Sequence, residues 1–121
     1  METSSILLQE SLLLIWNNRN AAERLSIMEK IYAPDVTFFE DDKGQPFIGF
    51  ESINNLIEKL QQNWSPDFEF TITETPKSNH NVQHISWNLG IPGEEPIAIG
   101  MDVAIIEAGK IKFLYLLLNN K

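Results

Sequence analysis

Asp102 lies in the middle of an apolar segment, Pro96 to Glu107, with the sequence PIAIGMDVAIIE. Its content of Ile and Val predicts a β-strand, and the two-residue period of a strand gives Asp102 mostly small neighbours on its own face. These neighbours are Ala98, Gly100, Ala104 and Ile106. Because both faces of the segment are apolar, we expect Asp102 to be buried, and therefore paired, hydrogen-bonded or neutral. The small neighbours leave space beside its carboxyl group for an aromatic side chain or a ligand.

Glu40 is the second candidate for acid–base chemistry. It ends a predicted strand, Asp35 to Glu40, and opens an acidic loop, EDDKG, where an acid is often simply solvated. Two carboxyl groups that face one apolar pocket, one ionised and one neutral, can abstract a proton and stabilise the enolate that forms. We expect Glu40 to be the base and Asp102 the acid or oxyanion donor. The structural alternative for Asp102 is a hydrogen bond to Trp16, Tyr32 or a backbone amide.

Apolar and aromatic residues are expected to form the wall of the same pocket. Trp87 shares a predicted strand face with Ile85 and Leu89, and we expect it to point inward opposite Gly100. Tyr32, at the end of a predicted helix, either lends its hydroxyl to the pocket or packs in the core. The predicted ligand-binding residues are Trp16, Tyr32, Phe38, Ile85, Trp87 and Gly100.

Composition excludes several other classes of function. The chain has 121 residues, which fits one domain spanning 1–121, and a net charge of −8, which disfavours nucleic-acid partners. Neither a basic patch nor a long apolar run points to a membrane. Cysteine is absent, and the two histidines, His80 and His84, are about 13 Å apart on a predicted strand, too far to share a metal ion. We expect no metal and no cofactor, and a cytoplasmic protein because no positively charged leader opens the sequence.

Hydrophobic periodicity predicts helices first and a series of strands afterwards, which is an α+β arrangement. The helices are expected at 3–17, 21–32 and 50–64, the first of them buried over much of its girth, and Asn20 with Glu23 has the form of a capping box. Pro34 is expected to stop the second helix, and Asn54 to lie on the polar face of the third. Strands are predicted at 35–40, 68–75, 80–89, 96–107 and 110–118, with a loop at 76–79 and a tight turn at Ala108-Gly109.

The apolar residues of the last predicted strand indicate how the protein assembles with other copies of itself. In IKFLYLLL, Phe113, Tyr115 and Leu117 lie on one face and Leu114, Leu116 and Leu118 on the other. A sheet wrapped around helices buries only one of its faces in its own core. We expect a second copy of the sheet to cover the other face and form a homodimer.

Segments in this order and spacing resemble the SnoaL-like branch of the nuclear transport factor 2-like superfamily. They are WNNRN, IYAPDVTFFED, SWNLGIPG and GMDVAIIEAGKI, and together they extend over most of the chain. The resemblance implies a cone of three N-terminal helices closed by a strongly curved antiparallel sheet, with a pocket in its mouth and a dimer through the outer face of the sheet. It implies isomerase, cyclase or dehydratase chemistry in some members and no activity in others, so the fold does not settle the function.

The resemblance also suggests roles for single residues. Asp102 matches the protonated oxyanion-hole aspartate of the isomerase-like members, and Glu40 matches their general base, with Asp41 as the alternative. The helix-1 tyrosine of that oxyanion hole is not matched. Trp16 lies near its position, and an indole donates a hydrogen bond without transferring a proton. This difference argues against steroid-type isomerisation.

Two hypotheses for the function follow. The first is a protein that binds a small apolar ligand with a carbonyl group and transfers a proton without a cofactor. The second is a non-catalytic domain that holds a hydrophobic ligand or a partner. A solvent-open pocket that contains both acids favours the first. A cone filled by aromatic side chains, with Glu40 turned outward, favours the second, and the residues expected to fill it are Trp16, Trp87, Phe38 and Phe70.

Overall fold

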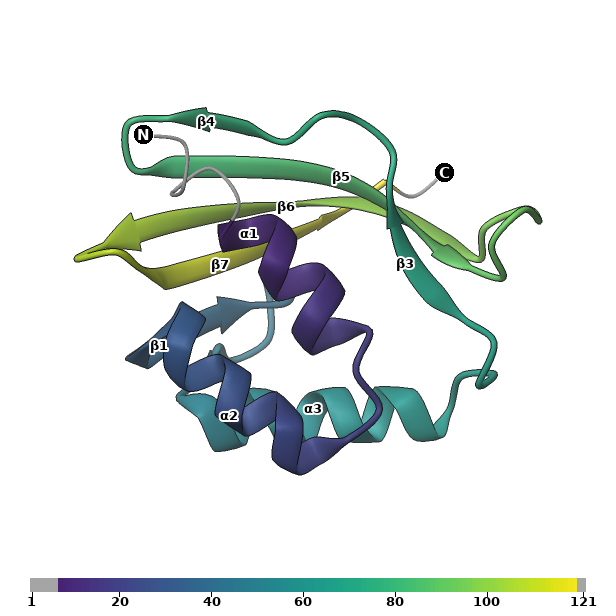
Figure 1. The fold of residues 1–121 in the computed structure, drawn as a ribbon, viewed down its shortest axis with the longest axis horizontal. Coiled ribbons are helices and arrows are strands. Elements are labelled where there is room, and N and C mark those ends of the chain that lie inside the picture. Colours follow the sequence, from purple (N-terminus) through teal and green to yellow (C-terminus); the bar gives the residue numbers. More distant parts are fainter. Residues whose placement is uncertain (1–6, 120–121) are drawn as a thin grey trace.

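The computed structural model describes residues 7–119. The helical elements are α1 (Leu7–Glu10), the π-helical turn η2 (Ser11–Trp16) that continues it, α2 (Ala21–Ile31) and α3 (Phe50–Gln62). The strands are β1 (Tyr32–Phe39), β2 (Phe47–Ile48), β3 (Glu69–Ile72), β4 (Lys77–Asn79), β5 (Val82–Gly90), β6 (Ala98–Glu107) and β7 (Lys110–Leu118). The helices pack on one curved sheet (Figure 1), which confirms the expected α+β fold.

The sheet has the order β2-β1-β7-β6-β5-β3, with β4 paired to β5. β5, β6 and β7 are antiparallel neighbours, and the Ala108-Gly109 turn joins β6 to β7 as predicted, with both residues at positive φ. β1, however, pairs with β7 in parallel, so the sheet is mixed and the expectation of a purely antiparallel sheet is wrong. The expected loop at 76–79 is also wrong for Lys77–Asn79, because these residues form β4 and pair with β5.

The first helix differs from its prediction in extent and in winding. Of the predicted range 3–17, residues 3–6 lie outside the described part, and the helix ends at Trp16. The N–H of Asn17 donates to the carbonyl of Leu12, five residues back, as in a π-helix. Leu13 and Leu14 are 37 % and 47 % exposed, so the expected burial around the helix is wrong for these two residues.

The second helix begins as predicted and ends one residue early. The side chain of Asn20 accepts the N–H of Glu23 at 2.9 Å, which caps the helix. Tyr32 already belongs to β1, and Pro34 lies inside this strand rather than stopping the helix. The pairing of β1 with β7 is interrupted between Tyr32 and Thr37, which accommodates a residue without an N–H.

A buried arginine joins α2 to α3. Arg24 is 0 % exposed, and its guanidinium donates to Asn54 Oδ1 at 2.5 Å, Gln61 Oε1 at 2.8 Å and Glu58 Oε1 at 2.7 Å. It also donates to the carbonyl of Asn18 at 2.7 Å. Asn54 is therefore buried against α2, and our expectation that it lies on a polar outer face is wrong.

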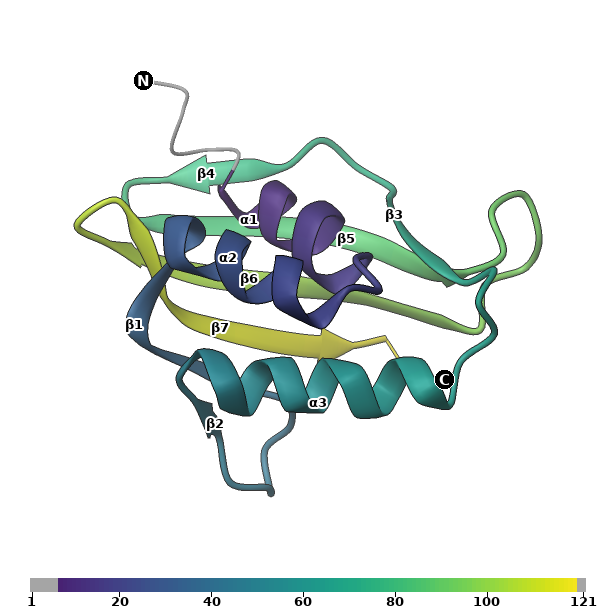
Figure 2. The same ribbon diagram turned by 60° about the horizontal axis from the view of Figure 1, so that its bottom comes forward.

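The helices cover one face of the sheet and leave the other face partly exposed (Figure 2). Side chains of β5 and β6 alternate between buried inward positions and partly exposed outward ones, and the helices lie against the inner face (Figure 2). Within residues 7–119 the helices therefore cover the inner face of the Asp102 strand, and its outer face stays partly exposed. Among these residues, we find no helix with the length and apolar character of a membrane span.

Candidate functional site

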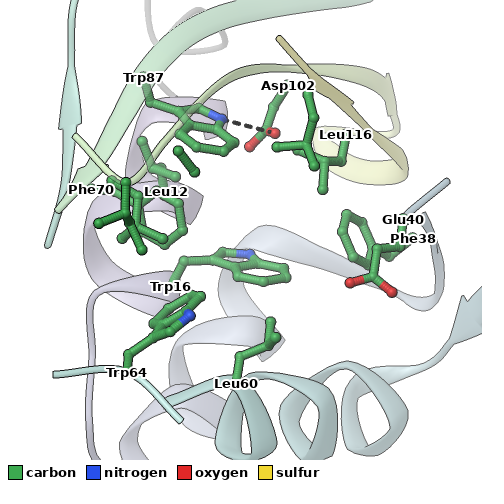
Figure 3. Close-up of a pocket in the computed structure, with 14 residues that line it drawn as sticks. Leu12, Trp16, Phe38, Glu40, Leu60, Trp64, Phe70, Trp87, Asp102 and Leu116 are labelled. Carbon is green, nitrogen blue, oxygen red and sulfur yellow. Dashed lines mark hydrogen bonds between the residues drawn. The ribbon is translucent and has the colours of Figure 1, made fainter. Parts of the chain in front are cut away.

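A cavity of about 210 Å³ lies between the helices and the inner face of the sheet. Its wall is apolar apart from two carboxyl groups, those of Glu40 and Asp102, which Figure 3 shows on different sides of the space. The other lining residues are Leu12, Trp16, Phe38, Leu60, Trp64, Phe70, Trp87, Leu89, Ile97, Ala98, Leu116 and Leu118. This is smaller than the roughly 300–1,000 Å³ of pockets that take drug-sized molecules, so it suits a compact ligand.

Asp102 is the more deeply buried of the two acids, at 8 % exposure. The indole Nε1–H of Trp87 donates to its Oδ1 at 3.1 Å (Figure 3). The sequence suggested Trp16, Tyr32 or a backbone amide as the hydrogen-bond partner of Asp102. The partner in the structure is Trp87. Burial raises the pKa of Asp102 from 3.8 to about 7, although the bond from Trp87, which favours the ionised form, acts in the opposite direction.

The strand register explains how Trp87 reaches Asp102. Trp87 lies opposite Gly100 and Ile85 lies opposite Asp102, so the indole crosses β6 at the glycine. A Cβ atom at Gly100 would lie 2.8 Å from Cζ2 of Trp87, closer than real contacts allow. Glycine at this position therefore gives the indole room to lie beside the carboxyl group.

Glu40 follows the last residue of β1 and lines the cavity while remaining partly exposed. Its burial raises its pKa, and the nearby charge of Asp41 raises it further. Asp41 is exposed, and its Oδ1 accepts the backbone N–H groups of Lys43 and Gly44 at 2.9 and 2.6 Å, which lowers its pKa. Between the two acids left open by the sequence, Glu40 is therefore the one that lines the cavity.

The predicted ligand-binding residues divide into two groups. Trp16, Phe38 and Trp87 line the cavity, whereas Tyr32, Ile85 and Gly100 do not line it, and we withdraw the expectation of direct ligand contact for these three. Tyr32 lies fully buried behind the wall, where Ser11 Oγ is 2.6 Å from its hydroxyl oxygen and Trp16 Nε1 donates to it at 3.2 Å. Its burial raises its pKa to about 12, so it is a neutral anchor for Trp16.

Several residues that line the cavity were not among the predicted ligand-binding residues. Trp64 follows α3 at the end of its apolar stripe, and Phe70 occupies an inward position of β3, so both had a periodicity signal. Asn17 had none. Its side chain accepts the N–H of Phe70 at 2.7 Å and donates to the carbonyl of Phe70 at 3.0 Å, as a neighbouring strand would. It thereby holds Phe70 at the cavity wall.

No group of three or more metal-ligating side chains occurs within residues 7–119. His84 lies on the outer face of the sheet, where its Nε2 is 3.4 Å from the sulfur of Met101. His80 lies in the turn before β5 and is exposed. The cavity itself combines a largely apolar wall with two carboxyl groups, which are groups that take up and release protons.

Neither a protein-family model nor a curated protein sequence matches this chain. Several solved structures are nevertheless similar to it in fold. A candidate isomerase of the SnoaL-like family from Agrobacterium tumefaciens has a TM-score of 0.84 at 23% identity, over 98% of this chain and 99% of the other.

Two further structures are similar over most of their length. A candidate SnoaL-like polyketide cyclase from Jannaschia has a TM-score of 0.75 at 12% identity, over 97% of this chain and 86% of the other. A candidate ketosteroid isomerase from Kribbella flavida has a TM-score of 0.73 at 16% identity, over 99% of this chain and 80% of the other. The protein therefore has the nuclear transport factor 2-like fold of the SnoaL-like and ketosteroid isomerase-like proteins.

Proposed function

We propose that this protein binds a small, largely apolar molecule with a carbonyl group in its cavity and transfers a proton to or from the carbon beside that group. The observation that carries the proposal is that Glu40 and Asp102 both line one small apolar cavity. The similarity in fold to candidate isomerases and cyclases agrees with it without fixing the reaction.

The two acids differ in a way that suits this chemistry. Asp102 is buried, and its pKa of about 7 keeps a large fraction protonated at neutral pH, so that it donates a hydrogen bond to a carbonyl oxygen. Glu40 is only partly exposed, and its burial and the charge of Asp41 raise its pKa, which makes its carboxylate a stronger base, so it serves as the base. As charge develops on the oxygen of the ligand in the transition state, the Asp102 proton stabilises it.

The test is hydrogen–deuterium exchange in small cyclic ketones. Cyclopentanone and cyclohexanone are incubated in D₂O with the protein, and loss of their α-proton signals is followed by NMR. We expect wild type to accelerate exchange over buffer, and Glu40→Gln to lose the acceleration by roughly 10²–10⁴-fold, the usual contribution of a general base. Asp42→Asn is the matched control, because Asp42 is an exposed acid in the same loop that does not line the cavity.

Exchange at the buffer rate with wild type would refute proton transfer, and equal acceleration by wild type and Glu40→Gln would refute the role of Glu40 as the base. If the ketone binds but does not exchange, the protein is a non-catalytic ligand-binding domain, which is the second hypothesis. Saturation-transfer NMR on the same samples distinguishes these two outcomes.

We also propose that the protein is a homodimer through the outer face of its sheet. Apolar side chains of β6 and β7 face outward in register, with Met101 opposite Leu117 and Val103 opposite Tyr115. Tyr115 and Leu117 are 37% and 51% exposed, and Phe39 stacks on Tyr115 with ring centroids 4.7 Å apart. A continuous apolar surface of this kind is typical of a subunit interface.

A further inference from the structure

We propose that the cavity also binds small hydrophobic ammonium ions, with the cationic group held between aromatic rings and the carboxylates of Glu40 and Asp102. The inference rests on the proposed function only in taking the cavity as the ligand site, since it does not require proton transfer. It follows from the charge, the aromatic content and the hydrogen-bonding groups of the cavity wall.

The charged groups that line the cavity are both acidic. They are the carboxyl groups of Glu40 and Asp102, and within residues 7–119 no Lys, Arg or His lines this space. Arg24, the buried cation of the described residues, is bonded to Asn54, Gln61 and Glu58 between α2 and α3 and does not line the cavity. A cation entering the cavity therefore meets negative charge that no described side chain of the wall neutralises.

Five aromatic residues line the same space: Trp16, Phe38, Trp64, Phe70 and Trp87. Phe70 meets Trp16, Trp64 and Trp87 at interplanar angles of 89°, 73° and 89°, so the rings stand as separate walls and not as one flat stack. Aromatic rings around a desolvated cation attract it through their quadrupoles, and tryptophan does so most strongly.

Hydrogen-bond donors, in contrast, are few in this cavity. Of the three indoles that line the cavity, that of Trp16 directs its N–H to the hydroxyl of Tyr32 and that of Trp87 directs its N–H to Asp102, and Trp64 is the third. A carboxylate or phosphate ligand would meet two acids and find two of the three indole donors engaged, so anions are disfavoured. Quaternary and tertiary ammonium ions need few donors from the wall, because they bind through charge and apolar contact.

The experiment compares two probes of the same shape. Choline and 3,3-dimethyl-1-butanol differ in that a neutral carbon replaces the quaternary nitrogen, so their affinities separate charge recognition from apolar fit. Isothermal titration calorimetry at pH 7 should give at least about tenfold tighter binding for choline, in keeping with a desolvated cation–π contact. Glu40→Gln should weaken choline about tenfold and leave the alcohol unchanged, whereas Asp42→Asn should change neither.

The pH dependence in wild type is a second test that needs no variant. Besides Asp102, the ionisable groups at the cavity and directly behind its wall are Glu40 and Tyr32, and Tyr32, with a pKa of about 12, stays neutral between pH 6 and 8. As Asp102 loses its proton over this range, choline should bind more tightly by several-fold, and the alcohol should not. A neutral ketone that accepts a hydrogen bond from protonated Asp102 should show the opposite trend.

Equal affinity for both probes, no detectable binding of choline, or choline affinity that falls with rising pH would overturn the inference. Each of these results leaves the ketone-exchange experiment unaffected. Conversely, tight choline binding with no ketone exchange would support the ammonium site and refute the proton-transfer proposal.

Discussion

Replacing Asp102 by asparagine should remove the pH dependence that this residue gives to folding. The pKa of Asp102 is raised from 3.8 to about 7 in the folded protein, a difference of roughly 3 pH units. Each unit corresponds to about 1.4 kcal/mol, so the total linked free energy is about 4 kcal/mol. Because the folded state holds the proton more tightly, this stability is fully present below about pH 4 and is lost as the pH rises through about 7.

The asparagine side chain of this variant has no proton to lose, and its oxygen can still accept the N–H of Trp87, which lies 3.1 Å from Oδ1 in the wild type. The new amide N–H group, if unpaired, costs about 1–3 kcal/mol at every pH. We therefore expect Asp102→Asn to be no more stable than wild type at pH 5 and more stable at pH 8. About two of the three pH units lie between pH 5 and 8, so over this range the stability difference between the two proteins should change by about 3 kcal/mol.

The assay is urea unfolding followed by far-ultraviolet circular dichroism at pH 5, 6, 7 and 8. Groups other than Asp102 titrate in both proteins, so the difference between the two curves isolates this carboxyl group. Asp42→Asn, at an exposed position, provides the control for a charge change alone. Parallel stability curves for wild type and Asp102→Asn would refute the reasoning, since they would mean that burial does not raise the pKa of Asp102.

Three further changes test other parts of the structure. Arg24→Met should cost about 3–5 kcal/mol of unfolding free energy, because it leaves buried acceptors unpaired. Arg19→Met, at an exposed arginine, should cost less than about 1 kcal/mol. Similar losses for the two variants would contradict the buried network around Arg24. Gly100→Ala should cost about 1–3 kcal/mol in the same urea assay, because its methyl group collides with Trp87, and wild-type stability would show that the indole moves aside without loss. Tyr115→Glu should convert a dimer into a monomer in sedimentation velocity, and a wild type that is already monomeric at high concentration would disprove the proposed interface.

Periodicity predicted much of what surrounds the cavity. The burial of Asp102, expected from the apolar residues on both faces of its strand, is confirmed, and the two-residue period of β5 correctly placed Trp87 inward opposite Gly100. The partner of Asp102 was not predicted, because a strand period gives the face of a side chain but not the direction of its ring. From the sequence, the indole of either Trp16 or Trp87 could reach Asp102. The structure shows that Trp87 does so and that Trp16 donates to Tyr32 instead.

Polar residues in helices were harder to interpret. Asn54 looks like a surface residue, since an amide in an amphipathic helix is usually solvated. It is buried because Arg24, far earlier in the chain, needs acceptors at the α2–α3 contact. The parallel pairing of β1 with β7 was missed for a similar reason, since neighbours far apart in sequence leave no signal in local periodicity.

All three tryptophans of the chain, Trp16, Trp64 and Trp87, line the cavity. Their emission therefore originates at the site itself, with no contribution from indoles elsewhere in the protein. Because the N–H of Trp87 is bonded to Asp102, loss of the Asp102 proton places a negative charge beside an excited indole. The protein thus contains an intrinsic optical reporter of its own cavity, one that can follow occupancy and protonation without an attached dye.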